Sequence, residues 1–265
     1  FLDWPSNSNK DAIAAGLQAL MVWGMRVGVE FAELFKDRQL SNDCKAAEKK
    51  LVKAASRVYK KFLASCPAPD APGSKQVAAL MAITGLIDAP KADKEFLSIN
   101  GAQGFSTFYG YYMLEAMAAA GNFQGALDVI REYWGAMIDL GATSFWEDFD
   151  INWIPNAAPI DELVPEGKKD IHGDCGAYCY VGFRHSLCHG WASGPTSWLS
   201  HHILGVEVLE PGCRQVRITP HLGDLQWVKG TFPTPYGEIQ IYHERQANGN
   251  VISEVKAPKE VSVIK

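Results

Sequence analysis

The stretch Ser106–Leu140, STFYGYYMLEAMAAAGNFQGALDVIREYWGAMIDL, predicts two helices that are joined only by Gly121 and Asn122. Glycine often ends a helix in the left-handed conformation, and an asparagine side chain can cap the start of the next helix. A connection this short forces the two helices to lie antiparallel as neighbours. Antiparallel helical hairpins are therefore the expected building unit of this part of the chain.

The helical periodicity continues on both sides of this hairpin. Toward the amino terminus, apolar residues recur at helical spacing in two long segments. Cys66–Ser74, CPAPDAPGS, then interrupts the pattern with three prolines and a glycine. The expected further helices run from a cap at Asn7, Ser8 or Asn9 to about Leu34, from near Ser41 to Phe62, from about Lys75 to Ile87, and from about Ser186 to Leu204.

After Gly205 the apolar residues alternate instead. Val216 and Ile218 flank Arg217, and Asn248–Gly249 is a strong hairpin turn between two apolar runs. This pattern predicts a small antiparallel β-sandwich of about 60 residues. The chain is therefore expected to be an α+β, multidomain chain, with helical hairpins in 1–204 and the sandwich in 205–265.

Composition and charge limit the partners. The 265 residues are 47% hydrophobic and 21% charged with a net charge of -5, values typical of a globular protein. No basic stripe extends beyond one helix face, so neither nucleic acid nor a membrane is expected as a partner. The longest apolar stretch, 19–29, contains Arg26 and is predicted to be too short and too polar to span a bilayer.

The segment Gly141–Asp150, GATSFWEDFD, carries the best catalytic candidate. It places Glu147 beside Trp146, which is expected to be exposed, with Asp148 close behind. A carboxylate near an apolar wall can hold and deprotonate a water molecule. In an inverting glycosidase, such a base faces a carboxylic acid roughly 6.5–9.5 Å away. The same pattern also fits a loop with solvated acids at the end of a helix.

Two further features could bind a sugar. Trp4, just ahead of the first helix, fits either a core position or a platform that stacks on a sugar face. Asp3 beside it could accept hydrogen bonds from sugar hydroxyls. His189 precedes a stretch of small residues that would let the backbone approach a ligand closely.

Histidines and cysteines gather between residues 172 and 189, but their spacing argues against zinc. Cys175 and Cys179 are four residues apart, and only five residues separate Cys179 from His185, far fewer than in a zinc-finger loop. We therefore expect no metal and no other cofactor. The pairing of the six cysteines is left open.

Four segments of the chain together resemble a known family. They are FLDWP at Phe1–Pro5, GATSFWEDFD, SLCHGWASGPTSWL at Ser186–Leu199, and VEVLEPGCRQVRITPHLGDLQWVKGTFPTPYGEIQI at Val206–Ile241. In content and order they resemble elements of the bacterial α-L-rhamnosidases, glycoside hydrolase family 78, over nearly the whole chain. Glu-Asp-Phe-Asp departs from the family's more usual Glu-Arg-Trp, and Cys188 replaces a common asparagine.

The resemblance implies part of an (α/α)6 barrel in 1–204 and the C-terminal β domain in 205–265. It also implies inverting hydrolysis of terminal α-L-rhamnosides, with a rhamnose-containing glycan as the partner. Glu147 falls at the position of the general base, Trp4 and Trp146 at aromatic positions of the sugar pocket, and His189 at a sugar contact.

The resemblance further implies that the general acid lies upstream of this chain, which opens on Phe-Leu-Asp-Trp-Pro without a signal peptide and is expected to be a fragment. The fragment alone is expected to be inactive and to self-associate through its open half-barrel. A periplasmic or extracellular location is expected for the full-length protein. The alternative is a non-catalytic carbohydrate-binding or scaffold module. A helical-repeat interaction protein fits less well, because no fixed period recurs.

Overall fold

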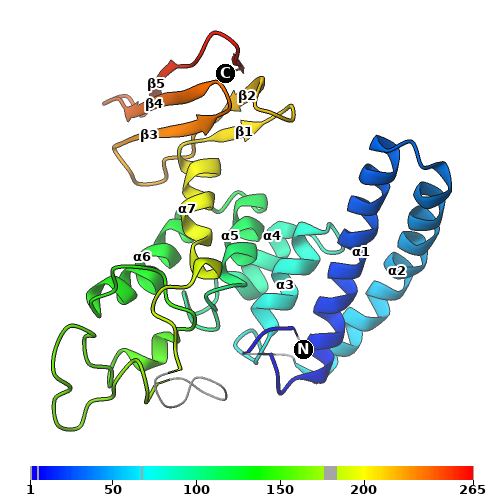
Figure 1. Cartoon of the computed structure of the whole chain (residues 1–265). Helices are drawn as coiled ribbons and strands as arrows, with labels where there is room; N and C mark the ends of the chain where they lie inside the picture. Colours follow the sequence, from blue (N-terminus) through cyan, green and yellow to red (C-terminus); the bar gives the residue numbers. More distant parts are fainter. Residues whose placement is uncertain (1, 5, 67, 176–183, 265) are drawn as a thin grey trace.

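The helices form the larger body of the protein, and the strands form a smaller body at one end of it (Figure 1). The computed structural model describes residues 2–4, 6–66, 68–175 and 184–264. Within these residues every helix precedes the first strand, β1 at Val206–Val208. The predicted fold class, α+β with helical hairpins followed by a small sandwich, is confirmed.

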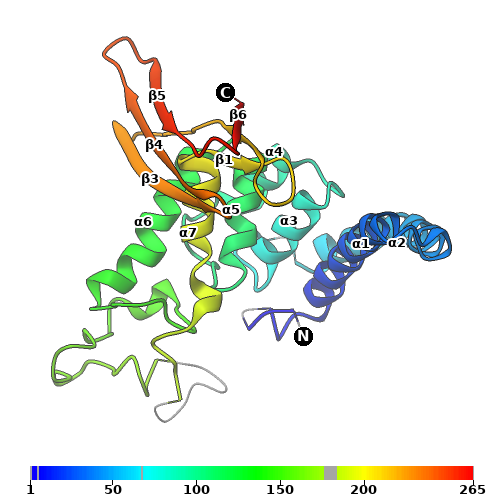
Figure 2. The same ribbon diagram turned by 45° about the horizontal axis from the view of Figure 1, so that its top comes forward.

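The first two helices form a long hairpin that stands to one side of the others (Figure 2). They are α1, Lys10–Leu34, and α2, Arg38–Ser65. Of the three predicted caps, Asn9 is the one used, since its Oδ1 accepts a hydrogen bond from the Ala12 N–H at 3.0 Å. Asp37 caps α2 by accepting from the Leu40 N–H at 2.9 Å, so this helix begins earlier than predicted.

The predicted hairpin at Ser106–Leu140 is confirmed as α5, Gly110–Ala119, and α6, Phe123–Asp139. Gly121 has φ of 79°, and Asn122 Oδ1 accepts from the Gly125 N–H at 3.0 Å. Helix α5 begins later than predicted because residues 106–109 form a turn. The hydroxyls of Ser106 and Thr107 in that turn bond to residues of the candidate site instead.

The remaining helices are short. Helix α3, Ser74–Ile83, is shorter than predicted and is followed by α4, Ala89–Ala92, and the π-helix η1, Asp93–Leu97, which the sequence analysis missed. The single helix expected at 186–204 is divided instead. It consists of the 3-10 turn η3, Gly190–Ala192, then α7, Gly194–Trp198, and the π-helix η4, Leu199–Ile203. Pro195 in the first turn of α7 favours a new helix start there.

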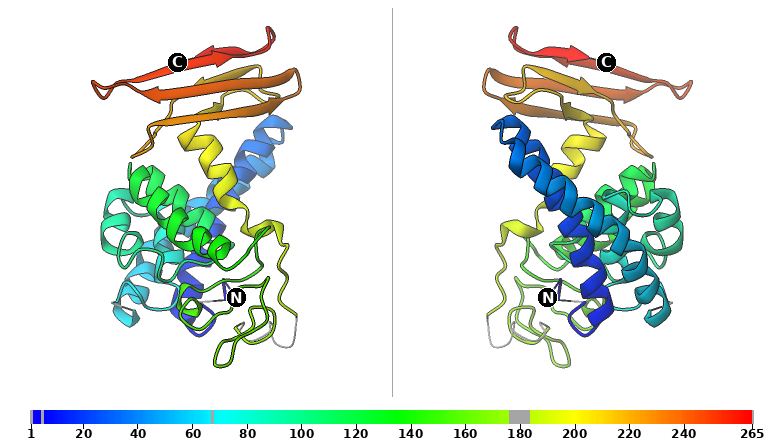
Figure 3. Two further views of the ribbon diagram at one scale, coloured as in Figure 1. Left: turned by 90° about the vertical axis from the view of Figure 1, so that its left-hand side faces the viewer. Right: turned by 90° about the vertical axis from the view of Figure 1, so that its right-hand side faces the viewer.

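The strands form two three-stranded sheets that pack face to face (Figure 3). Val216 and Ile218 of one sheet share a core with Ile239 and Ile241 of the other. Gly249, with φ of 86°, lies in the predicted turn. The predicted antiparallel pairing has one exception, since β2 and β6 run parallel. The first sheet has the order β1, β2 (Gln215–Ile218), β6 (Ser262–Ile264), and the second has the order β3 (Trp227–Thr234), β4 (Gly237–Arg245), β5 (Val251–Lys256).

The sandwich is attached to the helical body by several contacts. The ring of His221 stacks on Phe123 of α6 with a centroid distance of 3.7 Å, and Asp224 forms a salt bridge with Arg131 at 2.8 Å. Gly205 joins the two bodies with φ of 78°, and an added Cβ there would lie 2.4 Å from the Thr219 carbonyl carbon. The junction therefore requires glycine.

Helix α1 carries a broad apolar surface that the described part of the chain leaves exposed, including Met21, Phe31 and Leu34. The helix has 25 residues and a mean hydropathy of 1.4, enough to cross a membrane by length and composition. The expectation that this stretch is too short and too polar to span a bilayer is therefore wrong by length and composition. Core helices of soluble proteins meet the same criterion. The expected self-association through an open half-barrel stays a prediction.

Candidate functional site

The candidate site lies where two loop segments pair at the end of the helical body opposite the strands (Figures 1 and 3). The Glu147 N–H donates to the Ser186 carbonyl at 2.9 Å, and the His189 N–H donates to the Phe145 carbonyl at 2.7 Å. These bonds bring Glu147 and His189, which are 42 residues apart in the sequence (189 − 147), into one short ladder. Both side chains are half-buried.

Glu147 is held firmly by its main chain. Its carbonyl oxygen accepts hydrogen bonds from Thr107 Oγ1 at 2.7 Å and Trp191 Nε1 at 2.6 Å. Its side-chain Oε2 accepts from the Ser186 N–H at 3.1 Å. The second carboxylate oxygen, Oε1, accepts no hydrogen bond from the residues that the structure describes. One oxygen is thus anchored and the other can accept a proton from water.

An aromatic surface lies beside this carboxylate. The Trp191 ring is 4.5 Å from the His189 ring and 5.7 Å from the Phe108 ring, centroid to centroid. Trp191 is 37% exposed and Phe108 is 38% exposed, so both rings offer apolar surface to a ligand. Neither residue is among the site residues predicted from the sequence. The signals for them were the five aromatic residues in 105–112 and the position of Trp191 two residues after His189.

Trp146 does not lie on that surface. Its side chain is 0% exposed and contacts the Phe149 ring at 5.9 Å, and its Nε1 has no hydrogen-bond partner among the residues that the structure describes. The expectation of an exposed Trp146 is wrong. Trp146 packs among the residues of the main core, whereas the neighbouring Glu147 is only half-buried. A role in sugar binding stays a prediction for Trp146, although its ring offers no exposed surface.

Asp3 is also buried, and protein groups already occupy its oxygens. Oδ2 accepts from Ser106 Oγ at 2.6 Å and from Gln76 Nε2 at 3.1 Å, and Oδ1 accepts from the Trp4 N–H at 2.9 Å. Burial raises the pKa of Asp3. In this arrangement Asp3 ties the amino-terminal segment to the turn before α5. Trp4 is half-buried, and the sugar contacts of both residues stay predictions.

Asp148, next to Glu147 in the sequence, provides a second carboxyl group at the site. Burial, reinforced by the charges of Asp3, Asp150 and Glu147, raises the pKa of Asp148 to about 7. The His185 ring lies beneath it, with Nε2 accepting from the Asp148 N–H at 3.1 Å. Burial lowers the pKa of His185, so a neutral ring fits this acceptor role. The site therefore combines one anchored carboxylate with a neighbour that is protonated near neutral pH.

This raised pKa predicts a pH-dependent stability. Unfolded Asp148 ionises near pH 3.8, whereas the folded protein holds the proton until about pH 7. Between these values the unfolded state binds fewer protons, so the contribution of Asp148 to stability falls as pH rises. We expect Asp148→Asn to gain stability relative to the parent chain as pH rises from 4 to 7, and to gain no more above that range.

Urea unfolding of both chains at several pH values measures this difference. Asp150→Asn, which changes an exposed neighbouring acid, is the matched control and should show a smaller pH-dependent change. A difference between Asp148→Asn and the parent chain that is constant from pH 4 to pH 8 would contradict the prediction.

Among the described residues, no group of three or more histidines, cysteines, aspartates or glutamates is arranged to hold a metal ion. Cys179, part of the sequence cluster, lies outside the described residues. The expectation of no metal and no cofactor therefore stays a prediction.

Comparison with known proteins identifies the fold. Residues 205–264 match the family model of the bacterial alpha-L-rhamnosidase C-terminal domain. A solved structure of the family-78 rhamnosidase of Bacillus sp. GL1 matches 92% of this chain with a TM-score of 0.67 and 23% identity. The chain has an α-L-rhamnosidase fold. The predicted resemblance to the C-terminal portion of family-78 α-L-rhamnosidases is confirmed.

Two further α-L-rhamnosidase structures show the same fold. The enzyme of Aspergillus terreus matches 92% of this chain with a TM-score of 0.69 and 17% identity. The Streptomyces avermitilis α-L-rhamnosidase, complexed with L-rhamnose, matches 93% with a TM-score of 0.63 and 17% identity. The chain spans 25%, 27% and 22% of these three rhamnosidases. No curated protein matches the chain in sequence.

Proposed function

We propose that the protein carrying this chain is an inverting glycoside hydrolase that removes terminal α-L-rhamnosyl groups, with Glu147 as its general base. The observation that supports this most directly is the geometry of the Glu147 carboxylate. Ser186 anchors Oε2, Oε1 accepts no hydrogen bond from the described residues, and exposed Trp191 lies alongside. The α-L-rhamnosidase fold supports the sugar class.

The reaction is a single displacement. Glu147 takes a proton from water as the water oxygen bonds to the anomeric carbon. The bond from that carbon to the leaving oxygen breaks, and a carboxylic acid from a segment upstream of this chain protonates the leaving oxygen. His189 and the Trp191 ring would position the sugar, because an aromatic face packs on the C–H surface of a pyranose while polar groups bind its hydroxyls.

Asp148 would give this reaction its pH dependence. Its ionisation near pH 7 adds a negative charge to a site that already contains Glu147. Arginine is the family's more usual residue at this position. This chain therefore has an acid that holds a proton, Asp148, where the family usually has a cation. We expect this difference to affect which substrate the site accepts.

The proposal is tested by assaying aryl α-L-rhamnosides with two proteins. The 265-residue chain is expected to release no aglycone, because only one half of the acid–base pair is present. A protein extended upstream to include the carboxylic acid is expected to hydrolyse the substrate with inversion. Hydrolysis by the isolated chain, or retention of configuration by the extended protein, would contradict the mechanism.

The other parts of the proposal follow from the same fold. Residues 1–204 would form part of the catalytic barrel and residues 205–265 its C-terminal β domain, with a periplasmic or extracellular location for the full-length protein. A non-catalytic carbohydrate-binding module is the second candidate, which the exposed rings of Trp191 and Phe108 also suit. Sugar binding without turnover in the extended protein would favour that module.

A further inference from the structure

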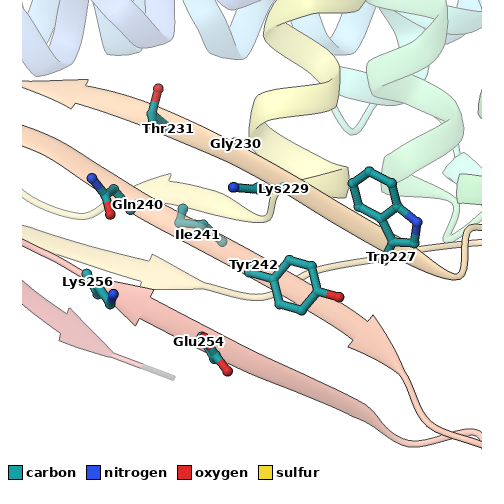
Figure 4. A pocket seen from close by; sticks show the side chains of 9 residues that line it. All are labelled: Trp227, Lys229, Gly230, Thr231, Gln240, Ile241, Tyr242, Glu254 and Lys256. Carbon is teal, nitrogen blue, oxygen red and sulfur yellow. The ribbon is translucent and has the colours of Figure 1, made fainter.

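A groove of about 860 Å³ lies on the sandwich, far from Glu147. It covers the outer face of the sheet β3–β4–β5 (Figure 4), at the opposite end of the molecule from the loops that carry the candidate site (Figure 1). The side chains on the other face of this sheet, such as those of Ile239 and Ile241, pack into the sandwich core. The groove is therefore a separate surface and not an extension of the Glu147 site.

The register of the strands arranges the groove in rows. Lys229, Tyr242 and Glu254 form one row across the three strands, and the next row contains Gln240 and Lys256. Neighbouring strands lie about 4.8 Å apart, so the members of a row are within reach of one small ligand. In Figure 4 these side chains stand on the same side of the sheet. The surface is thus an ordered alternation of aromatic, amide and charged groups.

Trp227 sits at one end of the groove and is 60% exposed. It pairs with Glu244, two residues from Tyr242 along β4, so the two aromatic side chains are diagonal neighbours about 7–8 Å apart. An exposed tryptophan of this kind loses water-exposed apolar area when a flat ligand covers it. Two adjacent aromatic side chains offer a platform for more than one ring of a ligand.

The polar groups beside this platform are available for a ligand. Among the described residues, Lys229, Glu254 and Lys256 form no salt bridge within 4.0 Å, and the Gln240 side chain makes no hydrogen bond. The groove therefore presents both donors and acceptors. Its two lysines and one glutamate nearly balance in charge, which disfavours a polyanion such as nucleic acid. Alternating charged residues also disfavour a lipid surface.

We propose that this groove binds an oligosaccharide. A pyranose ring has an apolar C–H face and a rim of hydroxyls. It is therefore bound best by aromatic faces that lie beside hydrogen-bonding side chains, as they do in this groove. The faces of Trp227 and Tyr242 would pack on the rings, while Lys229, Gln240, Glu254 and Lys256 would bind hydroxyl oxygens and hydrogens. Binding at this second site requires no catalysis by Glu147. The proposal of an oligosaccharide site can therefore be tested independently of the proposed hydrolysis.

The test measures binding of a panel of neutral plant oligosaccharides, an oligogalacturonide and free L-rhamnose to the 265-residue chain by calorimetry and protein-observed NMR. At least one neutral oligosaccharide should bind and shift signals of β3–β5. Trp227→Ala should weaken this binding by roughly tenfold or more, and Trp227→Phe should retain part of it. Glu147→Gln should bind as the parent chain does.

Trp191→Ala is the matched control, because it removes an exposed tryptophan beside Glu147 and leaves the groove intact. Binding that Trp191→Ala abolishes and Trp227→Ala leaves unchanged would overturn the proposal and place the sugar at the catalytic site. Two other results would overturn it as well. One is no binding of any panel member at millimolar concentration. The other is binding of the oligogalacturonide alone that depends on the lysines and not on Trp227.

Discussion

Glu147→Gln is expected to lower the rate of α-L-rhamnoside hydrolysis by about 10²–10⁴-fold in a protein that carries this chain and its upstream acid. The amide keeps the shape of the side chain and the Oε acceptor for the Ser186 N–H, which lies 3.1 Å from Oε2 in the parent chain. It cannot take a proton from water. Folding and sugar binding should therefore be preserved while the chemical step is lost.

The experiment compares kcat and KM on an aryl α-L-rhamnoside. We expect the loss to lie in kcat, because the glutamine removes an interaction made in the transition state. Glu162→Gln, which changes an exposed acid in the same loop region, is the matched control and should leave both constants unchanged. Unchanged turnover in Glu147→Gln would remove Glu147 from the mechanism.

Trp146→Ala is expected to destabilise the chain by about 3–5 kcal/mol, as is typical when a large buried aromatic residue is truncated. The ring is 0% exposed and contacts Phe149 within the main hydrophobic core. Its removal leaves a cavity under the segment that carries Glu147. Trp146→Phe should cost less, since it keeps much of the volume and removes an indole N–H that has no partner in the described part of the chain.

The midpoint of urea unfolding, followed by fluorescence and circular dichroism, measures this change. Trp227→Ala is the matched control, because the same substitution at a residue that is 60% exposed should change stability little. An equal, small effect of both substitutions would show that Trp146 does not support the core. Together the two variants separate a structural tryptophan from one offered to a ligand.

Local patterns in the amino-acid sequence predicted most of the helices, strands and turns. The hairpin at Gly121–Asn122, the cap at Asn9 and the turn at Asn248–Gly249 all occur where their residue types favour them. Each depends on neighbours within a few positions, and such short-range preferences are visible in sequence. The division of the helix at 190–203 into three segments was not predicted. The apolar spacing there is helical throughout, and it does not reveal that new segments begin at the glycines and the proline.

The candidate site was only partly predictable. The acidic segment 141–150 and His189 could be chosen from residue type and from family resemblance, and the structure brings Glu147 and His189 together. Phe108 and Trp191 were missed because their approach to Glu147 depends on contacts between distant segments, as in the bond from Trp191 Nε1 to the Glu147 carbonyl. The raised pKa of Asp148 likewise results from burial, which sequence does not reveal.

Residue type and spacing were enough to place the long helices and the strands and to pick out residues with the chemistry for hydrolysis. Which of those residues are exposed and which are buried depends on how distant segments pack together. Backbone hydrogen bonds between 145–147 and 186–189 hold this segment so that Glu147 is half-buried while Trp146 is fully buried. That arrangement depends on a segment some 40 residues away in the chain, which no local periodicity can specify.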